Sequence, residues 1–343
     1  MTRALDDEAL LPLVDALAPG AWLSGEALAA AAGVSRAALA KRIDQIEAWG
    51  LDIEARPGLG YRLAAPLERL DDARILAALA PHARAALKRL DVALRVDSTN
   101  QQQLHANPDH DPQALFAEAQ TAGRGRRGRD WRSPFGANLY LSLGWSFPAW
   151  PPALGTLPLA VGVACATALA GAGVPGLGLK WPNDLRVGND KLGGILIEQR
   201  GEFGGACRVV IGIGLNVAMT AAQAADVGQP WTSVQAVRAA HGLPPLSRNG
   251  LAAALLDAVL AMLDRFQHAG FAPFVDGWNR FDIATGRRVR IDGSGLGPAG
   301  SGLDGVACGI DAHGALIVQA DDGARHHLHA GDVSLRLPVA AAP

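Results

Sequence analysis

The first part of the chain spaces its apolar positions as three short helices. Residues 6–18 carry a stripe at intervals of three and four residues: Leu10, Leu11, Val14 and Leu17. Ser24 precedes a second helical stretch at 25–32, and Ser35 precedes a third that runs to about Trp49. Serine at these positions typically caps a helix N-terminus. Gly33 lies between the second and third stretches, so the pattern predicts a helix-turn-helix.

A short hairpin follows these helices. Residues 51–56 and 60–63 flank Pro57-Gly58, a turn signal between two strand-like runs. A helix-turn-helix followed by such a wing is the winged DNA-binding arrangement, whose third helix enters the major groove. The candidate DNA contacts are Ser35, Arg36, Lys41, Arg42, Arg56 and Arg62. The segment 1–64 holds six Lys/Arg against nine Asp/Glu, so a helical module for protein contacts has a similar pattern.

The rest of the chain changes pattern twice. Residues 66–90 are rich in Ala and Leu and predict a helical connector, and 91–284 mix buried strands with helices. From 285 to 343 the chain is Gly-rich with short alternating strands, which predicts a small SH3-like β-barrel. With 1–65 as the winged module, the expected fold class is multidomain α/β (α+β) with a mixed central sheet. The expected central strands are 94–96, 114–119, 138–145, 178–181, 185–187, 194–199 and 209–217, and the helices are 99–107, 157–172 and 249–266.

Composition favours a protein of the cytoplasm. The 343 residues have a net charge of -2, which excludes a generally basic surface. Three cysteines far apart predict neither a disulfide framework nor a cysteine-based zinc site. The N-terminus is acidic and lacks the apolar run of a secretory signal. Residues 157–174 carry no charge, but they are mostly Ala and Gly, which favours a buried helix over a membrane span.

A glycine–arginine loop is the most informative motif. Gly123, Gly125 and Gly128 match the dinucleotide-binding fingerprint by letter, but a strand-like run follows where that motif needs a helix. The segment 131–183 also lacks the acidic residue that would bind ribose. Five arginines lie among the glycines: Arg124, Arg126, Arg127, Arg129 and Arg132. Guanidinium groups and exposed backbone N–H groups suit a ligand with several anionic oxygens.

A second motif combines two lysines with an Asn-Asp pair. Lys180 ends one strand, Asn183-Asp184 begin a turn, and Lys191 opens the next strand beside Gly193-Gly194. Such a set can surround a triphosphate and its magnesium ion. Gly212 and Gly214 lie within a strand, which allows a ligand to approach the backbone closely.

The chain shows no nucleophile paired with a base. The histidines His326, His327 and His329 lack acidic partners in sequence and are interpreted as surface residues. Many cations without a nucleophile suit a reaction in which the substrate itself attacks phosphorus, such as formation of an acyl-adenylate from a carboxylate and ATP.

The motifs GRGRRGRDWRSPFGANLYLSL, KWPNDL and KLGGILIE, in this order, resemble the bacterial biotin–protein ligases. STNQ and IGIGLNV fit the same family. The N-terminal module resembles that of ligases that double as the biotin operon repressor, and the tail resembles their C-terminal barrel. The resemblance implies that biotin and ATP, with Mg²⁺, give biotinyl-5′-AMP. It further implies transfer of the biotin to a lysine of the biotin carboxyl carrier protein of acetyl-CoA carboxylase.

The resemblance also assigns residues. Lys191 and Arg126 are the implied catalytic residues: Lys191 stabilises charge at the α-phosphate and Arg126 retains the intermediate. The implied biotin-binding residues are Ser98, Thr99, Asn100, Gln120, Arg124, Gly125, Arg126, Trp131, Lys191 and Gly194. The implied ATP and magnesium residues are Arg126, Arg127, Lys180, Asn183, Asp184, Asn216 and Trp231, with Asp184 as the metal ligand and Trp231 stacked on adenine.

Further implied partners are operator DNA and a second copy of the chain, in a homodimer formed when biotinyl-AMP is bound; no membrane is expected. Three alternatives stay open on the sequence. They are a lipoate–protein ligase, a ligase with a vestigial DNA-binding module, and a biotin-sensing regulator without ligase activity.

Overall fold

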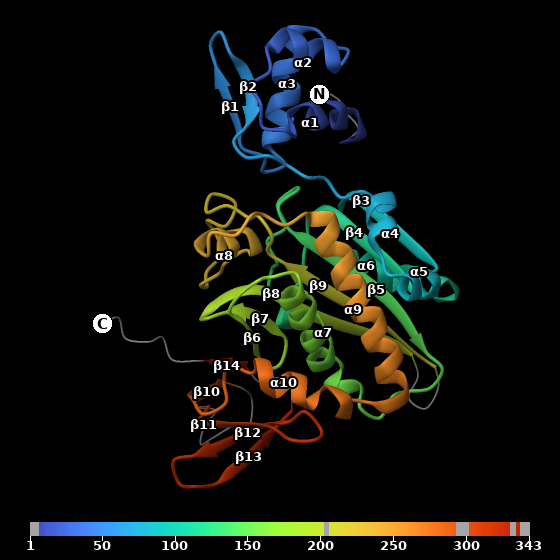
Figure 1. Cartoon of the computed structure of the whole chain (residues 1–343), viewed down its shortest axis with the longest axis vertical. Coiled ribbons are helices and arrows are strands. Elements are labelled where there is room, and N and C mark those ends of the chain that lie inside the picture. The colour runs from blue at the N-terminus through green and yellow to red at the C-terminus, as the bar shows by residue number, and fades with distance from the viewer. Residues whose placement is uncertain (1–6, 202–205, 293–301, 330–333, 337–343) are drawn as a thin grey trace.

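The computed structural model describes residues 7–201, 206–292, 302–329 and 334–336. Within them the chain forms three sheets, of two, seven and five strands. Figure 1 shows the N-terminal module at one end of the molecule, the seven-stranded sheet in the middle and the five-stranded sheet at the other end.

The N-terminal module is the expected winged helix-turn-helix. Its elements are η1 (Asp7–Leu10), α1 (Leu11–Leu17), α2 (Gly25–Ala31), α3 (Arg36–Glu47), β1 (Ile53–Arg56) and β2 (Gly60–Leu63). Both predicted caps are confirmed, because Ser24 Oγ accepts a hydrogen bond from the Ala27 N–H and Ser35 Oγ accepts one from Ala38. β1 and β2 pair antiparallel as the wing.

The module packs directly on the central domain. The rings of Trp49, just after α3, and Phe135 lie 4.8 Å apart. Phe135 and Ala119 of the central domain are buried in the same apolar cluster as the module's own helices. Gln223 of the central domain also donates a hydrogen bond to the Gly50 carbonyl. The module's core is therefore completed by residues more than fifty positions further along the chain.

The helical connector consists of two short helices, α4 (Asp72–Ala78) and α5 (Pro81–Ala86), and the central sheet begins at Arg89. The sheet has the order β3-β4-β5-β9-β8-β7-β6, with β3 and β4 parallel and the other neighbours antiparallel. Its strands are β3 (Arg89–Val96), β4 (Gln113–Gln120), β5 (Leu139–Phe147), β6 (Leu177–Lys180), β7 (Asp184–Val187), β8 (Asp190–Gly201) and β9 (Cys207–Leu215). Every strand expected in this region is present.

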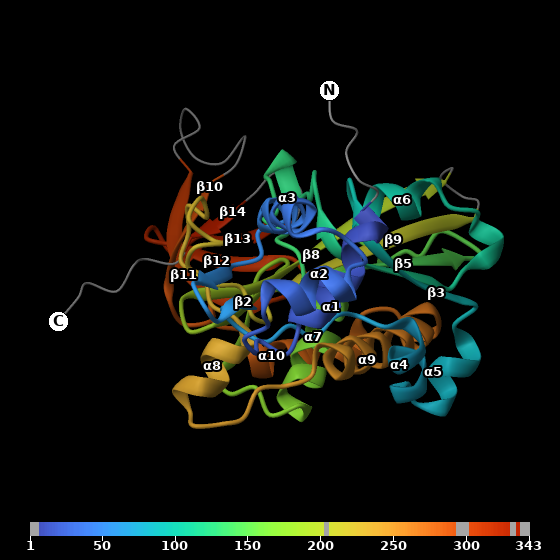
Figure 2. The ribbon, with the colours of Figure 1, turned by 90° about the horizontal axis from the view of Figure 1, so that it is seen from above.

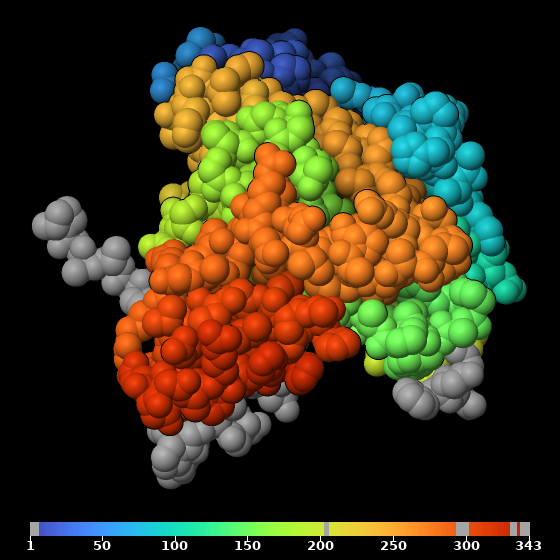
Figure 3. All heavy atoms as spheres, turned by 60° about the horizontal axis from the view of Figure 1, so that its bottom comes forward, coloured from blue at the N-terminus to red at the C-terminus, as the bar shows by residue number. Residues whose placement is uncertain are grey.

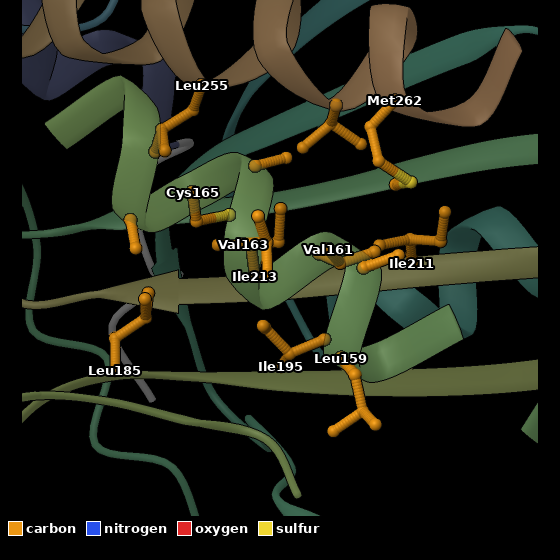
Figure 4. Packing of buried hydrophobic residues seen from close by; sticks show 14 of the residues in the cluster. Leu159, Val161, Val163, Cys165, Leu185, Ile195, Ile211, Ile213, Leu255 and Met262 are labelled. Atoms are coloured by element: carbon orange, nitrogen blue, oxygen red, sulfur yellow. The ribbon is translucent and has the colours of Figure 1, made fainter. Parts of the chain in front are cut away.

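The two faces of this sheet have different neighbours. Side chains alternate along a strand, and Ile211, Ile213 and Ile195 point toward α7 (Leu157–Gly171) (Figure 4). The helix α9 (Arg248–Ala269) covers α7 from outside. On the opposite face lies α6 (Thr99–His105), as the view from above shows (Figure 2). α8 (Val234–Ala240) and α10 (Val275–Phe281) were not expected from the sequence.

The uncharged segment is a core helix. Leu154–Gly171 is long and apolar enough to span a membrane. In the fold, however, the α7 side chains from Leu157 to Ala166 are almost all buried against the sheet and α9. The cysteines Cys165, Cys207 and Cys308 are free, as expected.

The C-terminal part forms a five-stranded antiparallel sheet in the order β13-β12-β11-β10-β14. Its strands are β10 (Arg288–Asp292), β11 (Leu303–Ile310), β12 (Leu316–Ala320), β13 (Arg325–Leu328) and β14 (Ser334–Arg336). Most of the Gly-rich stretch 291–304 lies outside the described residues. The sheet lies against the α9–α10 region (Figure 3), and Val289, Ile291 and Leu316 belong to the central core.

One buried ion pair joins the connector, the sheet and α9. Arg248 Nη1 lies 3.0 Å from Glu118 Oε2, with both side chains at most 4% exposed. The Leu70 N–H donates to the other oxygen of Glu118, and Arg248 donates to the carbonyls of Glu68 and Asn138. Four segments of the chain are therefore fixed by these two charges.

Replacing Glu118 with Ala should destabilise the protein by about 3–5 kcal/mol, because it leaves the Arg248 charge buried without its partner. Urea unfolding of the purified chain measures the change. The matched control is the double variant Glu118→Met with Arg248→Met, which removes both charges and should recover most of the loss. A double variant less stable than Glu118→Ala would contradict this interpretation.

Candidate functional site

A pocket lies on the α6 face of the central sheet. Its lining contains all but two of the residues that the sequence assigned to biotin or ATP. They are Ser98, Thr99, Asn100, Gln120, Arg124, Gly125, Arg126, Arg127, Trp131, Lys180, Asn183, Asp184, Lys191 and Gly194. They come from the start of α6, the end of β4, the arginine loop and the turns around β7. Segments that are remote from one another in sequence thus meet at one place.

The start of α6 builds a hydrogen-bonded end of the pocket. Thr99 donates through its N–H and its hydroxyl to Gln120 Oε1, at 2.8 and 3.1 Å. Ser142 Oγ lies 2.7 Å from Thr99 Oγ1 and 2.6 Å from Asn100 Oδ1. Ser98 is the N-cap residue, but its side chain makes no capping hydrogen bond. The buried Ser98 hydroxyl is thus not used for the helix cap that its position suggested.

The strand glycines make room for neighbouring side chains and also border the pocket. A Cβ on Gly212 would lie 2.3 Å from Asn100 Oδ1, and one on Gly214 would lie 2.5 Å from the Trp131 ring. Both glycines also line the pocket, so close approach of a ligand to the β9 backbone stays a prediction. They let Asn100 and Trp131 lie flat against β9, and those two side chains face the pocket.

The glycine–arginine segment is a hairpin loop over the pocket. The backbones of Arg124 and Asp130 pair in an isolated antiparallel β-bridge, and the Gly125 N–H donates to the Arg129 carbonyl at 2.7 Å. At the tip, Arg127 has φ 60° and Gly128 has φ 69°, the left-handed pair of a type I′ turn. The strand β5 follows the loop where the dinucleotide-binding fingerprint requires a helix, so this segment does not form that motif.

The lysine motif forms a charged cluster around one carboxylate. Lys191 Nζ lies 2.8 Å from Asp184 Oδ1, and both side chains are mostly buried. The same ammonium lies 5.4 Å from the centre of the Trp131 ring. Arg126 donates to Asn183 Oδ1 at 3.2 Å, which joins the arginine loop to this cluster. The two motifs therefore form one site.

Lys180 has an unusual protonation equilibrium. Burial lowers its pKa to about 8, the nearby Asp184 opposes that shift, and the positive charges of Arg186, Lys191 and Arg129 add to it. A partly buried site with excess positive charge binds an anionic ligand strongly, because the ligand compensates that charge. The cluster is suited to several anionic oxygens.

Two expected nucleotide residues line an adjoining cavity. Trp231 and Asn216 face a second hollow that shares Lys180, Lys191 and Trp131 with the pocket. The Asn216 amide donates to the Thr232 carbonyl at 3.1 Å, and the Lys191 N–H donates to the Pro230 carbonyl. Asn216 thus holds the Trp231 segment against β8.

Several lining residues were missed by the sequence interpretation. Tyr140 and Leu196 follow from strand alternation once the site face is known, whereas Ile195, which also lines the pocket, does not. Leu335 comes from β14, and Gln229 from the segment before Trp231. No local pattern marks those two, because only the tertiary arrangement brings them to the pocket.

The expected DNA contacts divide into exposed and internally bound groups. Lys41 and Arg56 are exposed, and so is Arg36, which pairs with Glu26. Arg42 instead donates to the carbonyls of Ala9 and Ala32, and Arg62 makes a two-point pair with Glu54. Arg42 and Arg62 thus hold the module together.

His327 and His329 are exposed, as expected, whereas His326 is half-buried, and His327 has an acidic partner that is remote in sequence. His327 Nδ1 lies 2.7 Å from Asp311 Oδ2. Among the described residues no group of three or more His, Cys, Asp or Glu side chains could hold a metal ion.

Three family models match the chain. The Biotin/lipoate A/B protein ligase family matches residues 92–216, an HTH domain matches 16–62, and the Biotin protein ligase C terminal domain matches 286–336. The matches fall within the central domain, the winged module and the C-terminal part of the chain, and the central match ends before α8.

Curated relatives and a solved structure extend this similarity. The bifunctional ligase/repressor BirA of Escherichia coli is 39% identical over 332 residues, 96% of this chain and 98% of its own length. The biotin–[acetyl-CoA-carboxylase] ligase of Mycobacterium tuberculosis is 34% identical over 253 residues, 72% of this chain and 88% of its own. The biotin protein ligase from Aquifex aeolicus in complex with biotin and ATP has a TM-score of 0.60 and 25% identity. It covers 73% of this chain and all of that one.

Binding of inorganic pyrophosphate should weaken as pH rises through about 8. The lowered pKa of Lys180 means that it loses its charge above that pH, and a bound anion restores the charge by drawing in a proton. Above pH 8 the affinity should fall by up to about tenfold per pH unit. The titration uses calorimetry, and Lys180→Arg is the control, because arginine stays charged. Equal pH profiles for the two proteins would exclude the role of Lys180, whatever the ionisation of pyrophosphate itself.

Proposed function

The chain belongs to the biotin protein ligase family, among the bifunctional ligase/repressors, and we propose from this premise how its residues perform the reaction. The protein is a biotin protein ligase with a repressor's DNA-binding domain. The observation that carries this function is the single pocket in which the arginine loop, the start of α6 and the lysine cluster meet. Biotin and ATP are its substrates.

The biotin ring system lies at the α6 end of the pocket. Ser98, Thr99, Asn100 and Gln120 offer hydrogen-bonding groups there, and the Trp131 ring supplies an apolar wall. The indole N–H of Trp131 is buried without a hydrogen-bond partner. A buried donor without a partner is costly, so a ligand oxygen that accepts from it adds to the affinity. Arg124, Gly125 and Gly194 complete this end.

The lysine cluster serves the first step. A biotin carboxylate oxygen attacks the α-phosphorus of ATP, an anhydride P–O bond forms, and the bond to pyrophosphate breaks. Lys191 moves from Asp184 to the α-phosphate oxygens and stabilises the developing negative charge. Lys180, Asn183, Arg126 and Arg127 bind the phosphates, and Trp231 with Asn216 form the adenine side.

The second step transfers biotin. The amine of the acceptor lysine attacks the acyl carbon of the adenylate, AMP leaves with the bonding electrons, and the amine loses a proton. The acyl-adenylate also reacts with water, so the arginine loop must cover it. Arg126 holds the loop to Asn183 and is placed to retain the intermediate until the acceptor arrives.

Magnesium fits this site as a companion of the phosphates. Mg²⁺ usually uses one or two carboxylates together with substrate phosphates. Asp184 is the carboxylate at the centre of the cation cluster, and it supplies such a ligand. Magnesium would screen phosphate charge there.

The remaining assignments concern the whole molecule. The acceptor is the biotin carboxyl carrier protein, and the liganded protein forms a homodimer in the cytoplasm. The domains comprise 1–65, the connector 66–90, the catalytic domain 91–284 and the C-terminal unit 285–343, whose sheet closes as an SH3-like barrel. Family similarity supports these assignments.

Transfer of labelled biotin to a carrier-domain fragment, with MgATP, tests the ligase. We expect transfer that needs ATP and that excess lipoate does not inhibit, with Lys191→Ala reduced by at least about 100-fold as for loss of an electrostatic stabiliser. Inhibition by lipoate with lipoyl transfer would favour a lipoate ligase. Biotin binding without transfer would leave a sensing regulator.

The exposed surface of the winged module binds operator DNA, and this binding gives the protein its repressor function. Arg56 is exposed and its guanidinium lies 3.9 Å from Glu54, whereas Arg62 is bound to Glu54 by two close contacts. Arg56 is thus the wing cation available to a phosphate.

Arg56→Ala should lower the salt dependence of DNA binding by about one phosphate, a slope change of roughly 0.9. Arg62→Ala should leave the slope nearly unchanged, and it serves as the matched control. Fluorescence anisotropy with duplex DNA from upstream of biotin-synthesis genes measures both, in the presence of biotinyl-AMP. Binding that is absent in every protein, with ligase activity intact, would show a vestigial module.

A further inference from the structure

A buried arginine behind the lysine cluster has no assigned role. Arg186 lies in β7, directly opposite Lys191 in the pairing with β8. Its side chain is only 10% exposed, and it does not line the pocket. A buried cation is costly unless its surroundings compensate the charge. The surroundings of Arg186 therefore indicate what it does.

Arg186 contacts the residues on both sides of the site lysine. Nη2 lies 3.8 Å from Asp184 Oδ2, while Lys191 holds Oδ1 of the same carboxylate at 2.8 Å. Nη1 donates to the carbonyl of Asn189, in the turn that leads into Lys191. Nε is buried without a hydrogen-bond partner. A single guanidinium thus bridges the carboxylate and the backbone turn that together position Lys191.

The charge arrangement explains why such a bridge is useful. Asp184 pairs with Lys191 in the described state, but the proposed first step requires Lys191 at the α-phosphate. When Lys191 leaves, the mostly buried Asp184 carboxylate loses the cation that lies nearest to it among the described ion pairs. Arg186 remains beside Oδ2 and keeps that charge compensated, since removing one partner of a buried pair is the costly event.

We propose that Arg186 is a positioning residue for adenylate formation. It holds Asp184 and the 188–190 turn in place, and thereby allows Lys191 to leave Asp184 for the α-phosphate. This inference rests on the proposed function, and it goes beyond it by separating the two half-reactions. Transfer of biotin from a finished adenylate does not require Lys191 to exchange partners, so it does not depend on Arg186.

The test measures the half-reactions separately in Arg186→Met. Biotin-dependent exchange of labelled pyrophosphate into ATP should slow by about 10- to 100-fold, the usual effect of removing a group that orients a site residue. Transfer of biotin from supplied biotinyl-5′-AMP to the carrier-domain fragment should match wild type. ATP affinity by calorimetry should fall, and biotin affinity should stay unchanged.

Two further variants separate positioning from loss of fold. Arg186→Lys keeps the charge and should restore part of the exchange rate. Arg238→Met removes another buried arginine, which donates to the backbone carbonyls of Ala172, Gly173 and Pro244, and should leave both half-reactions unchanged. In an Asp184→Asn background, Arg186→Met should add little further loss, because residues that act through one another are not additive.

The outcomes distinguish the two claims. Exchange at the wild-type rate in Arg186→Met, or equal slowing of both half-reactions, would overturn the role of Arg186. Full additivity with Asp184→Asn would also overturn it. Absence of exchange and transfer in the wild-type protein would instead overturn the proposed ligase function.

Discussion

The buried pair of Glu118 and Arg248 is the constraint on which the arrangement of the chain depends. Its two charges are shielded from water and bond to the backbone of Glu68, Leu70 and Asn138. Because an unpaired charge there would be strongly unfavourable, the pair favours the arrangement in which the connector, β4, the residue before β5 and α9 meet. Glu118 lies on the strand that ends at Gln120. The same constraint therefore fixes one end of the pocket.

The site combines a rigid face with a charged edge. On the α6 face of the sheet, small residues in β9 let Asn100 and Trp131 lie close to the strands. At the edge, Lys180, Lys191 and Arg186 surround Asp184, so positive charge exceeds negative before any substrate is present. An anionic nucleotide relieves that imbalance. Affinity for phosphate and the readiness of Lys191 to change partners thus have the same electrostatic origin.

Local sequence signals predicted much of this molecule. Helix caps at Ser24 and Ser35, the Pro57-Gly58 turn and the apolar strands depend on nearby residues, so the pattern alone identified them. Arginines among glycines and two lysines around Asn183-Asp184 indicated an anion site for the same reason. The resemblance to biotin–protein ligases then named residues that the fold gathers in one pocket, although Trp231 and Asn216 face its neighbouring hollow.

The sequence could not determine which side chains contact each other when they are far apart along the chain. Arg42 and Arg62 were expected to face DNA, yet their guanidinium groups bind Ala9, Ala32 and Glu54 within the module. Arg186 was an ordinary strand residue until β7 and β8 paired. Sequence determines which groups are available and which short elements they form, because those depend on neighbours along the chain. Only the tertiary structure decides which charge meets which, because burial and distance arise when remote segments pack together.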